Sequence, residues 1–279
     1  EKLFVNNQDN LSNVAIEFFG KKINYVELFK NIKDTSRAFF HSGVKEGDYV
    51  AICGTSIPEI AYSFYAMGYL GSIGLFIPPY LDKEKMISDI NYSNCEILVV
   101  MDKLYDYIKD TINNTSIKKI IIVPTLNSSL INFLLPKIKV DNDGKEILWN
   151  DFIKQFKNKE YPKMVPYKEK RPLSVVYSSG TTGMLKGILL SHDSYQNSVQ
   201  VYPEIGVDIH PGQKLYQVIP AWSSTGTSTC LHLPLTYGCC VFMDPRFEPD
   251  IFAKNISKKK INYAVGTTSL YEGFENEKN

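Results

Sequence analysis

The stretch YSSGTTGMLKG spans residues 177–187 and holds three glycines, four Ser or Thr residues and one lysine in eleven positions. It follows the apolar run LSVVY (173–177), which predicts a buried strand, and it precedes the segment 191–202, which we predict to be a helix. Glycine adopts backbone conformations that other residues avoid, and successive exposed N–H groups can then surround an anion. Lys186 adds a compact positive charge that suits a phosphate. The stretch therefore predicts a loop that binds a polyphosphate, with Mg²⁺ held mainly through the phosphate oxygens.

The spacing of the glycines separates this loop from two other nucleotide-binding motifs. The order Gly180, Gly183, Lys186, Gly187 does not match the GxxxxGK[ST] pattern of P-loops or the GxGxxG pattern of dinucleotide-binding folds. A surface turn rich in Gly, Ser and Thr that binds nothing is the alternative interpretation. The lysine inside the glycine frame, directly after a buried strand, favours phosphate binding.

The composition indicates a folded protein that is not a general nucleic-acid binder. The chain has 279 residues, of which 44% are apolar, and its formal net charge is +1. Nucleic-acid binders usually carry a basic excess, so no nucleic-acid partner is expected. None of the five cysteines forms a CxxC pair, which favours buried free thiols in a reducing cytoplasm over a zinc site or a disulfide framework.

The N-terminal sequence and two long uncharged stretches bear on localisation. The N-terminus is polar and shows no signal peptide, and the first residue is not Met, so residue 1 need not be the native start. Gly and Pro divide 60–81 into a short helix and a short strand, and 215–243 is rich in Ser, Thr, Gly and Gln. We therefore expect a cytoplasmic protein without a membrane span. A membrane-associated carrier is the alternative.

Apolar periodicity predicts helices that alternate with short strands. Helices are expected at 25–42, 59–70, 82–92, 149–156, 191–202 and 249–258, and strands at 48–53, 75–77, 96–101, 119–123, 173–177, 214–219, 239–243 and 261–265. Aliphatic runs such as EILVVM and KIIIV are typical of strands buried on both faces of a parallel sheet. The predicted fold class is α/β, with layered, mostly parallel sheets flanked by helices. We expect one αβ subdomain at 1–172, which ends in a surface connector, and a second at 173–279 that carries the phosphate loop.

The stretch 177–187 resembles the phosphate-binding signature of adenylate-forming enzymes, which include acyl-CoA synthetases, luciferase and the adenylation domains of peptide synthetases. The usual form is Y-[ST]-[ST]-G-[ST]-T-G-x-P-K-G, and only Leu185 departs from it, in place of proline. Weaker matches follow the order of the family along the chain: INYVEL (23–28), GDYVAI (47–52), SIPEIAYSFYAMGYLGSIGLFIPP (56–79), IPAWSSTG (219–226) and FEPDIFAKNISKKKINYAVGTTSLYEGF (247–274). The resemblance implies the large N-terminal domain of these enzymes, incomplete at its C-terminus.

The resemblance also implies a reaction and a set of roles. The reaction is ATP-dependent activation of a carboxylic acid to an acyl-adenylate with release of pyrophosphate, followed by transfer to coenzyme A. Ser178 would contact Mg²⁺, and Lys186 would be the catalytic cation that neutralises the phosphates. The other phosphate-binding residues would be Ser179, Gly180, Thr181, Thr182 and Gly183. The substrate pocket would be lined by Trp222, Ser223, Gly226, Thr227, Gly266 and Thr267, with Ser223 where the family often has histidine.

Parts of the family pattern are not found in the sequence. The adenine-binding segment, the ribose-binding aspartate, the hinge and the C-terminal lid domain are missing, so we expect a fragment with little activity alone. An amino-acid-activating adenylation domain is the nearest alternative, and it would hold the substrate amino group with an acidic residue, which 222–243 lacks. A non-catalytic nucleotide-binding module is the second alternative. A homodimer and a carrier-protein acceptor are left open.

Overall fold

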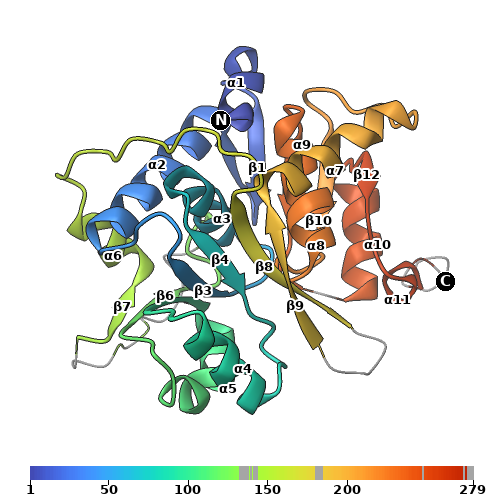
Figure 1. The fold of residues 1–279 in the computed structure, drawn as a ribbon. Coiled ribbons are helices and arrows are strands. Elements are labelled where there is room, and N and C mark those ends of the chain that lie inside the picture. The colour runs from blue at the N-terminus through green and yellow to red at the C-terminus, as the bar shows by residue number, and fades with distance from the viewer. Residues whose placement is uncertain are drawn as a thin grey trace.

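The computed structural model of the chain describes residues 1–131, 138, 140, 144–179, 185–246, 248–272 and 274. In this part of the chain the strands form one sheet of seven strands and one sheet of five, and helices cover and separate the two sheets (Figure 1). Most neighbouring strands run parallel. The predicted α/β class, with layered and mostly parallel sheets, is confirmed.

The seven-stranded sheet has the strand order β7-β6-β5-β3-β4-β8-β9. In chain order its strands are β3 (Tyr49–Cys53), β4 (Ile73–Phe76), β5 (Ile97–Met101), β6 (Lys119–Val123), β7 (Glu146–Leu148), β8 (Pro172–Ser179) and β9 (Leu185–Ser191). All neighbours pair in parallel except β8 and β9, which form an antiparallel hairpin. The carboxyl ends of β3, β4 and β8 therefore lie at the same edge of the sheet.

The five-stranded sheet has the order β12-β10-β11-β1-β2. Its strands are β1 (Val14–Phe18), β2 (Lys21–Asn24), β10 (Lys214–Gln217), β11 (Cys240–Met243) and β12 (Tyr263–Ala264). β1 and β2 form an antiparallel hairpin, and the other neighbours are parallel. The N-terminal hairpin thus completes a sheet whose other strands come from the C-terminal third of the chain.

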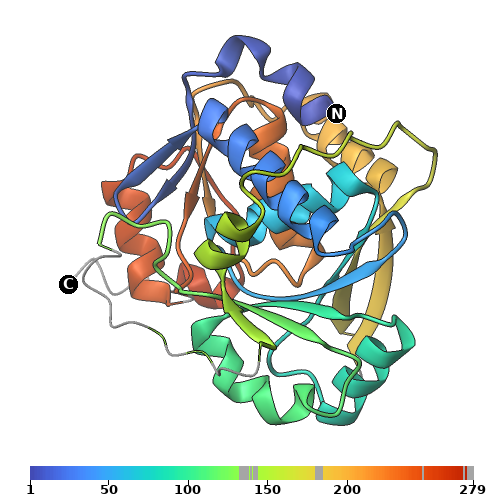
Figure 2. The same cartoon turned by 90° about the vertical axis from the view of Figure 1, so that its left-hand side faces the viewer.

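The helices form layers on both sides of each sheet. Helices α2 (Tyr25–His41) and α3 (Pro58–Leu70) lie between the sheets, and their buried side chains join one apolar cluster with side chains of β1, β3, β5 and β11. Helices α4 (Lys83–Tyr92) and α5 (Asp102–Ile112) cover the opposite face of the seven-stranded sheet (Figure 2). Helix α10 (Pro249–Lys258) covers the outer face of the five-stranded sheet. The remaining helices are α1 (Lys2–Asn6), η1 (Gln8–Asn10), α6 (Trp149–Gln155), α7 (His192–Glu204), α8 (Ser224–Thr227), the π-helix η3 (Ser228–His232), α9 (Leu233–Thr236) and α11 (Thr268–Tyr271).

Helix α2 shows how local sequence fixes an element. The side chain of Asn24 accepts a hydrogen bond of 2.8 Å from the backbone N–H of Glu27, which caps the first turn. Leu28 and Ile32 are buried on the inner face of the helix. Gly43, with a φ of +102°, follows the last turn in a conformation that glycine adopts readily.

The segment 156–171 crosses helix α2 on the surface (Figure 2). The hydroxyl of Tyr161 donates to Asp34 at 2.8 Å, and the hydroxyl of Tyr69 on α3 donates to the carbonyl oxygen of Pro162 at 3.2 Å. This agrees with the connector expected from the sequence, although β7, which precedes α6, adds an edge strand to the sheet.

The predicted helices and strands are found within a few residues of their expected bounds, but several strands were missed. Asp82 caps α4 as expected, and its side chain accepts a hydrogen bond from the backbone N–H of Lys85 at 3.1 Å. β1, β2, β7 and β9 were not predicted, nor was α5. The sheets also cross the expected subdomain boundary between residues 172 and 173, because β8 and β9 join the first sheet and β1 and β2 join the second. The division into 1–172 and 173–279 stays a prediction.

Two further findings concern membrane and thiol chemistry. No helix in the described ranges is both long enough and apolar enough to pass through a lipid bilayer.

All five cysteines are buried and free, and burial raises the pKa of the Cys53 thiol to about 12. The expectation of buried free thiols is confirmed.

His232 gives the fold a pH dependence. Burial lowers the pKa of its imidazole from 6.5 to about 4, and its Nδ1 atom lies 3.2 Å from the hydroxyl of Tyr65. Because the unfolded chain binds this proton more tightly, acid favours the unfolded state between these two pKa values. We expect the free energy of unfolding to fall by on the order of 3 kcal/mol across this range, and we expect His232→Gln to reduce that fall.

Urea unfolding near neutral pH and at about pH 5 measures the effect. His210 is exposed, and His210→Gln is the matched control substitution. The same loss of stability on acidification in His232→Gln and in the unaltered protein would contradict this prediction.

Candidate functional site

The β8–β9 hairpin places a hydroxyl and an ammonium group side by side. Ser178 on β8 lies directly opposite Lys186 on β9, and Tyr177 lies opposite Gly187. Side chains of directly opposite residues project from the same face of a sheet. Ser178 and Lys186 are both exposed, so both side chains are available to a ligand.

The turn of this hairpin carries most of the predicted phosphate donors. Gly180, Thr181, Thr182 and Gly183 lie outside the described residues, and Ser179 pairs with Leu185 at the end of the described ladder. Their role in phosphate binding stays a prediction. The predicted helix at 191–202 is confirmed as α7, which begins at His192, but the unpredicted strand β9 lies between it and the turn. The apolar residues of β9 add a strand to the edge of the sheet.

Tyr177 fixes the strand that leads into the turn. The ring is buried, and its hydroxyl donates a hydrogen bond of 2.6 Å to Asp89 on α4. Asp89 also forms an ion pair with Lys85, 2.9 Å away and one turn earlier on the helix. Burial, followed by the hydrogen bond to Asp89, raises the pKa of Tyr177. A Cβ atom at Gly187, opposite Tyr177, would lie 3.1 Å from a methyl group of Val175, so a side chain there would crowd β8.

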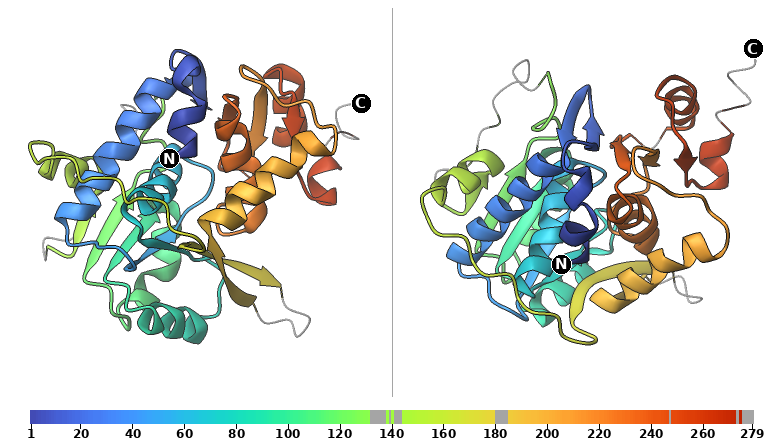
Figure 3. Two further views of the ribbon diagram at one scale, coloured as in Figure 1. Left: turned by 45° about the horizontal axis from the view of Figure 1, so that its top comes forward. Right: turned by 90° about the horizontal axis from the view of Figure 1, so that it is seen from above.

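The carboxyl ends of strands from both sheets meet at the segment that follows β10. The backbone N–H of Tyr177 donates to the carbonyl oxygen of Trp222 at 3.1 Å. Tyr80, which follows β4, contacts the Trp222 ring edge to face with 6.0 Å between ring centroids. The hydroxyl of Ser56, which follows β3, donates to the carbonyl oxygen of Ile219 at 3.3 Å. Figure 3 shows the hairpin of β8 and β9 beside the C-terminal third of the chain. Ligands of open α/β sheets bind at such strand ends, so this is the candidate site.

The residues after Trp222 hold their own backbone in place. The Ser223 hydroxyl donates to the carbonyl oxygen of Pro220 at 3.1 Å and accepts from the backbone N–H of Gly226 at 3.1 Å, which caps α8. A Cβ atom on Gly226 would lie 2.0 Å from the Pro220 carbonyl oxygen, so no side chain fits there. Trp222 is half-buried, whereas Gly226 and Thr227 are buried. Their predicted contacts with a substrate stay predictions.

A row of hydroxyl pairs, which the sequence did not reveal, joins helix α7 to this segment. The hydroxyl of Tyr195 lies 2.9 Å from the Thr227 hydroxyl and 2.7 Å from the Ser174 hydroxyl on β8. The pairs Ser198 with Ser228, at 2.6 Å, and Tyr202 with Thr229, at 3.0 Å, continue the row. Residues 195, 198 and 202 share one face of a helix, and this spacing of hydroxyl side chains was the available signal. Helix α7 therefore connects β8 to the end of the Trp222 segment.

Gly266 and Thr267 follow β12, the parallel neighbour of β10, so they lie at the same edge of the sheet as Trp222. Thr267 is exposed, and its hydroxyl lies 2.8 Å from the Ser269 hydroxyl at the start of α11. A Cβ atom on Gly266 would meet the Tyr271 ring at 3.2 Å. The position agrees with the predicted pocket wall, and the contact with a substrate stays a prediction.

The residues present fit a magnesium ion that arrives with a phosphate better than a preformed metal centre. Within the described ranges, no group of three or more His, Cys, Asp or Glu side chains could hold a metal ion. The exposed Ser178 hydroxyl is a single oxygen donor beside a cation. Magnesium commonly keeps several waters and binds through substrate phosphates with few protein oxygens.

Comparison with known proteins identifies the family. The sequence profile of the family described as AMP-binding enzyme matches residues 4–279. The chain is 23% identical over 277 residues to the long-chain-fatty-acid–CoA ligase of Bacillus subtilis (strain 168). This match covers 93% of this chain and 48% of that protein. It is 24% identical over 281 residues to the acetyl-coenzyme A synthetase of Escherichia coli (strain K12), with 91% and 41% covered. The chain thus spans less than half the length of these relatives.

Solved structures share the fold. A putative long-chain-fatty-acid CoA ligase from Rhodopseudomonas palustris CGA009 superposes with a TM-score of 0.81 at 14% identity, over 99% of this chain and 64% of that one. An anthranilate CoA ligase in complex with anthranoyl-AMP superposes with a TM-score of 0.78 at 18% identity, over 94% of this chain and 48% of that one. The predicted large N-terminal domain architecture is confirmed at the level of the fold.

The hydrogen bond between Tyr177 and Asp89 should stabilise the hairpin measurably. Tyr177→Phe removes the phenol hydroxyl and leaves Asp89 paired with Lys85, so we expect a loss of about 1.5–3 kcal/mol in the free energy of unfolding, as for hydrogen bonds to charged groups. Urea denaturation measures the change. Tyr80→Phe is the matched control, because the Tyr80 ring is 68% exposed. Equal stability of the two variants would show that the Tyr177 hydroxyl does not anchor the strand.

Proposed function

Because the chain belongs to the AMP-binding enzyme family, we propose that the full-length protein activates a carboxylic acid with ATP and transfers the acyl group to coenzyme A. In the first step a carboxylate oxygen attacks the α-phosphorus of ATP, and the bond to the β-phosphate oxygen breaks. The products are an acyl-adenylate and pyrophosphate. In the second step the sulfur of coenzyme A attacks the acyl carbon, AMP leaves, and the thiol proton is released to solvent.

The observation that carries this proposal is the exposed pair Ser178 and Lys186 at the end of a strand whose preceding residue is anchored. Lys186 neutralises the β- and γ-phosphates, and the turn supplies further donors. These donors are Ser179, Gly180, Thr181, Thr182 and Gly183. When bound, Mg²⁺ would supply positive charge on the phosphate oxygens, with the Ser178 hydroxyl as its protein contact. Catalysis of this kind depends on positioning and charge neutralisation, which a fixed strand end favours.

The Trp222 segment is proposed to receive the acid. Trp222 offers a half-buried aromatic face beside Tyr177, and Gly266 and Thr267 stand after the neighbouring strand. Ser223 and Gly226 fix the backbone here, so we propose that they shape the pocket through the capped turn. The hydroxyl of Thr227 pairs with the hydroxyl of Tyr195 on α7, and this contact stabilises the same turn.

The residues of this segment favour an acyl substrate over an amino acid. No acidic side chain occurs from 222 to 243, so a substrate ammonium group has no counter-charge in that segment. The relatives are named as a long-chain-fatty-acid–CoA ligase, an acetyl-coenzyme A synthetase and a 4-coumarate–CoA ligase, and these names support a carboxylic acid as the substrate. A cytoplasmic location is proposed because all five thiols are free and buried. A homodimer and a carrier-protein acceptor remain candidate arrangements of the full-length protein.

ATP–pyrophosphate exchange by the full-length protein tests the proposed reaction. We expect label to pass from pyrophosphate into ATP only when a suitable carboxylic acid is present, and a panel of fatty, short-chain and aromatic acids with matched amino acids identifies the substrate class. Coenzyme A should then convert the adenylate to a thioester that mass spectrometry detects. Nucleotide binding without exchange for any acid would leave only the alternative of a non-catalytic nucleotide-binding module.

Lys186→Ala in the full-length protein tests the role of the ammonium group. A charge-assisted contact with phosphate contributes about 1.5–3 kcal/mol, so kcat/KM for ATP should fall about 10- to 100-fold. The exposed Lys254 on α10 supplies the control, and Lys254→Ala should behave as the unaltered enzyme. Unchanged kinetics for Lys186→Ala would remove the phosphate role from this residue.

A further inference from the structure

A cavity lies between helices α2, α3 and α6, apart from the segment that follows β10. Its volume is about 580 Å³, which is in the range of small-molecule sites. Glu59 and Tyr62 from α3, Asn31 and Thr35 from α2, and Trp149 from α6 contribute to its lining. None of the predicted phosphate-binding or substrate-binding residues that the structure describes lines it.

Unpaired polar atoms gather at this cavity. Seven buried side-chain nitrogen or oxygen atoms in the described part of the chain make no hydrogen bond, and three belong to residues that line it. These atoms are Nε of Arg37, Oε2 of Glu59 and the hydroxyl of Tyr62, on side chains that are 7%, 0% and 3% exposed. Buried polar groups are almost always paired with protein, water or ligand, so the cluster indicates that a polar species occupies the cavity.

The pairing of Glu59 is half complete. Its Oε1 atom accepts hydrogen bonds from Ser128 at 2.5 Å and from Asn127 at 2.7 Å, which fixes the carboxyl group. The hydroxyl of Tyr62 lies near Asn31 and Ser128 without forming a hydrogen bond to a described residue. Burial raises the pKa of the Glu59 carboxyl. Its Oε2 atom has no partner among the described residues. A ligand hydroxyl suits this atom and the Tyr62 hydroxyl, because a hydroxyl both donates and accepts hydrogen bonds.

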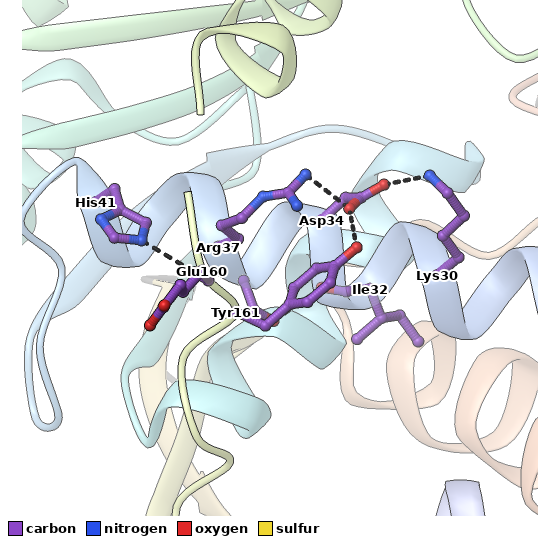
Figure 4. Close-up of polar contacts among 8 residues, drawn as sticks. Lys30, Ile32, Asp34, Arg37, His41, Glu160 and Tyr161 are labelled. Atoms are coloured by element: carbon purple, nitrogen blue, oxygen red, sulfur yellow. Dashed lines mark hydrogen bonds and ion pairs between the residues drawn. The ribbon is translucent and has the colours of Figure 1, made fainter. Parts of the chain in front are cut away.

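The rim of the cavity is basic. Figure 4 shows Asp34 between Lys30 and Arg37, with the Tyr161 hydroxyl donating to the same carboxylate. Asp34 is therefore already neutralised. Glu27 likewise pairs with Lys21 at 3.1 Å.

Two further cations complete this rim. Lys154 and Lys157, on and just after α6, are exposed, and neither forms an ion pair with a described residue. An excess of cations at the rim attracts an anion and repels an amine.

We propose that this cavity binds a small polyhydroxylated anion, with its hydroxyl groups at Glu59 and Tyr62 and its anionic group at Arg37, Lys154 and Lys157. A sugar phosphate and a sugar acid share this chemistry. The site is separate from the candidate adenylation site, and its occupancy does not require turnover.

Isothermal titration calorimetry with the full-length protein tests the proposal. Ribose 5-phosphate and gluconate are the anionic probes, and they distinguish a phosphate from a carboxylate head group. Glucose and putrescine are the neutral and cationic comparisons. We expect at least one anionic probe to bind, and to bind about 10-fold or more tightly than glucose and putrescine, as a single charge-assisted contact would already give.

Two variants assign that binding to this cavity. Lys154→Ala with Lys157→Ala should raise the dissociation constant of the bound probe about 10-fold or more, because charged hydrogen bonds are lost. Tyr62→Phe should raise it about 5-fold, because one neutral hydrogen bond is lost. Tyr62→Phe removes an unpaired hydroxyl, so its melting temperature should not fall. The double variant Lys103→Ala with Lys254→Ala, at exposed lysines of α5 and α10, is the matched control and should bind normally. No binding of either anion, equal binding of glucose or putrescine, or unchanged affinity in the α6 double variant would each overturn the proposal.

Discussion

The hydrogen bond from the backbone N–H of Tyr177 to the carbonyl oxygen of Trp222 is the contact on which the candidate site depends. Tyr177 belongs to the seven-stranded sheet, and Trp222 follows a strand of the five-stranded sheet. Helices α2 and α3 pack between these sheets, yet β8 directly contacts the segment that follows β10. Loops at the carboxyl ends of parallel strands collect ligands in α/β proteins, so this one contact brings the hairpin and the proposed acid pocket together.

Strand β8 is held from both of its faces, which explains how an exposed turn can be positioned. Tyr177 reaches α4 through Asp89, whereas Ser174 reaches α7 through Tyr195. Side chains alternate along a strand, so these two anchors lie on opposite faces of the sheet. The exposed side chain of Ser178 makes no hydrogen bond among the described contacts, so it does not have to exchange a protein partner for a ligand. The strand is fixed by its neighbours, and the side chains of Ser178 and Lys186 stay accessible.

Sequence periodicity revealed the elements that depend on local signals and missed those that depend on distant partners. Helix α4 carries its own cap, and β5 and β6 are short aliphatic runs, so both kinds of element were predicted. β1 is a strand because it pairs with β11, more than 200 residues later, and the local sequence around β1 does not predict that pairing. The phosphate signature drew attention to glycines and hydroxyls, but the anchor of Tyr177 lies 88 residues away on α4. The donors of the turn remain predictions from sequence alone.

The departure at Leu185 from the family pattern has a physical explanation in this hairpin. Proline would stiffen the end of the turn by fixing a backbone dihedral, and it is tolerated at the first residue of a strand. Leu185 is that first residue of β9, it pairs with Ser179, and its side chain packs against the apolar cluster that contains Tyr177. Apolar packing against an anchored ring restrains the same backbone by another route, since removing apolar surface from water is favourable. Lys186 therefore follows a restrained residue although the proline is missing, and its position opposite Ser178 is kept by the ladder itself.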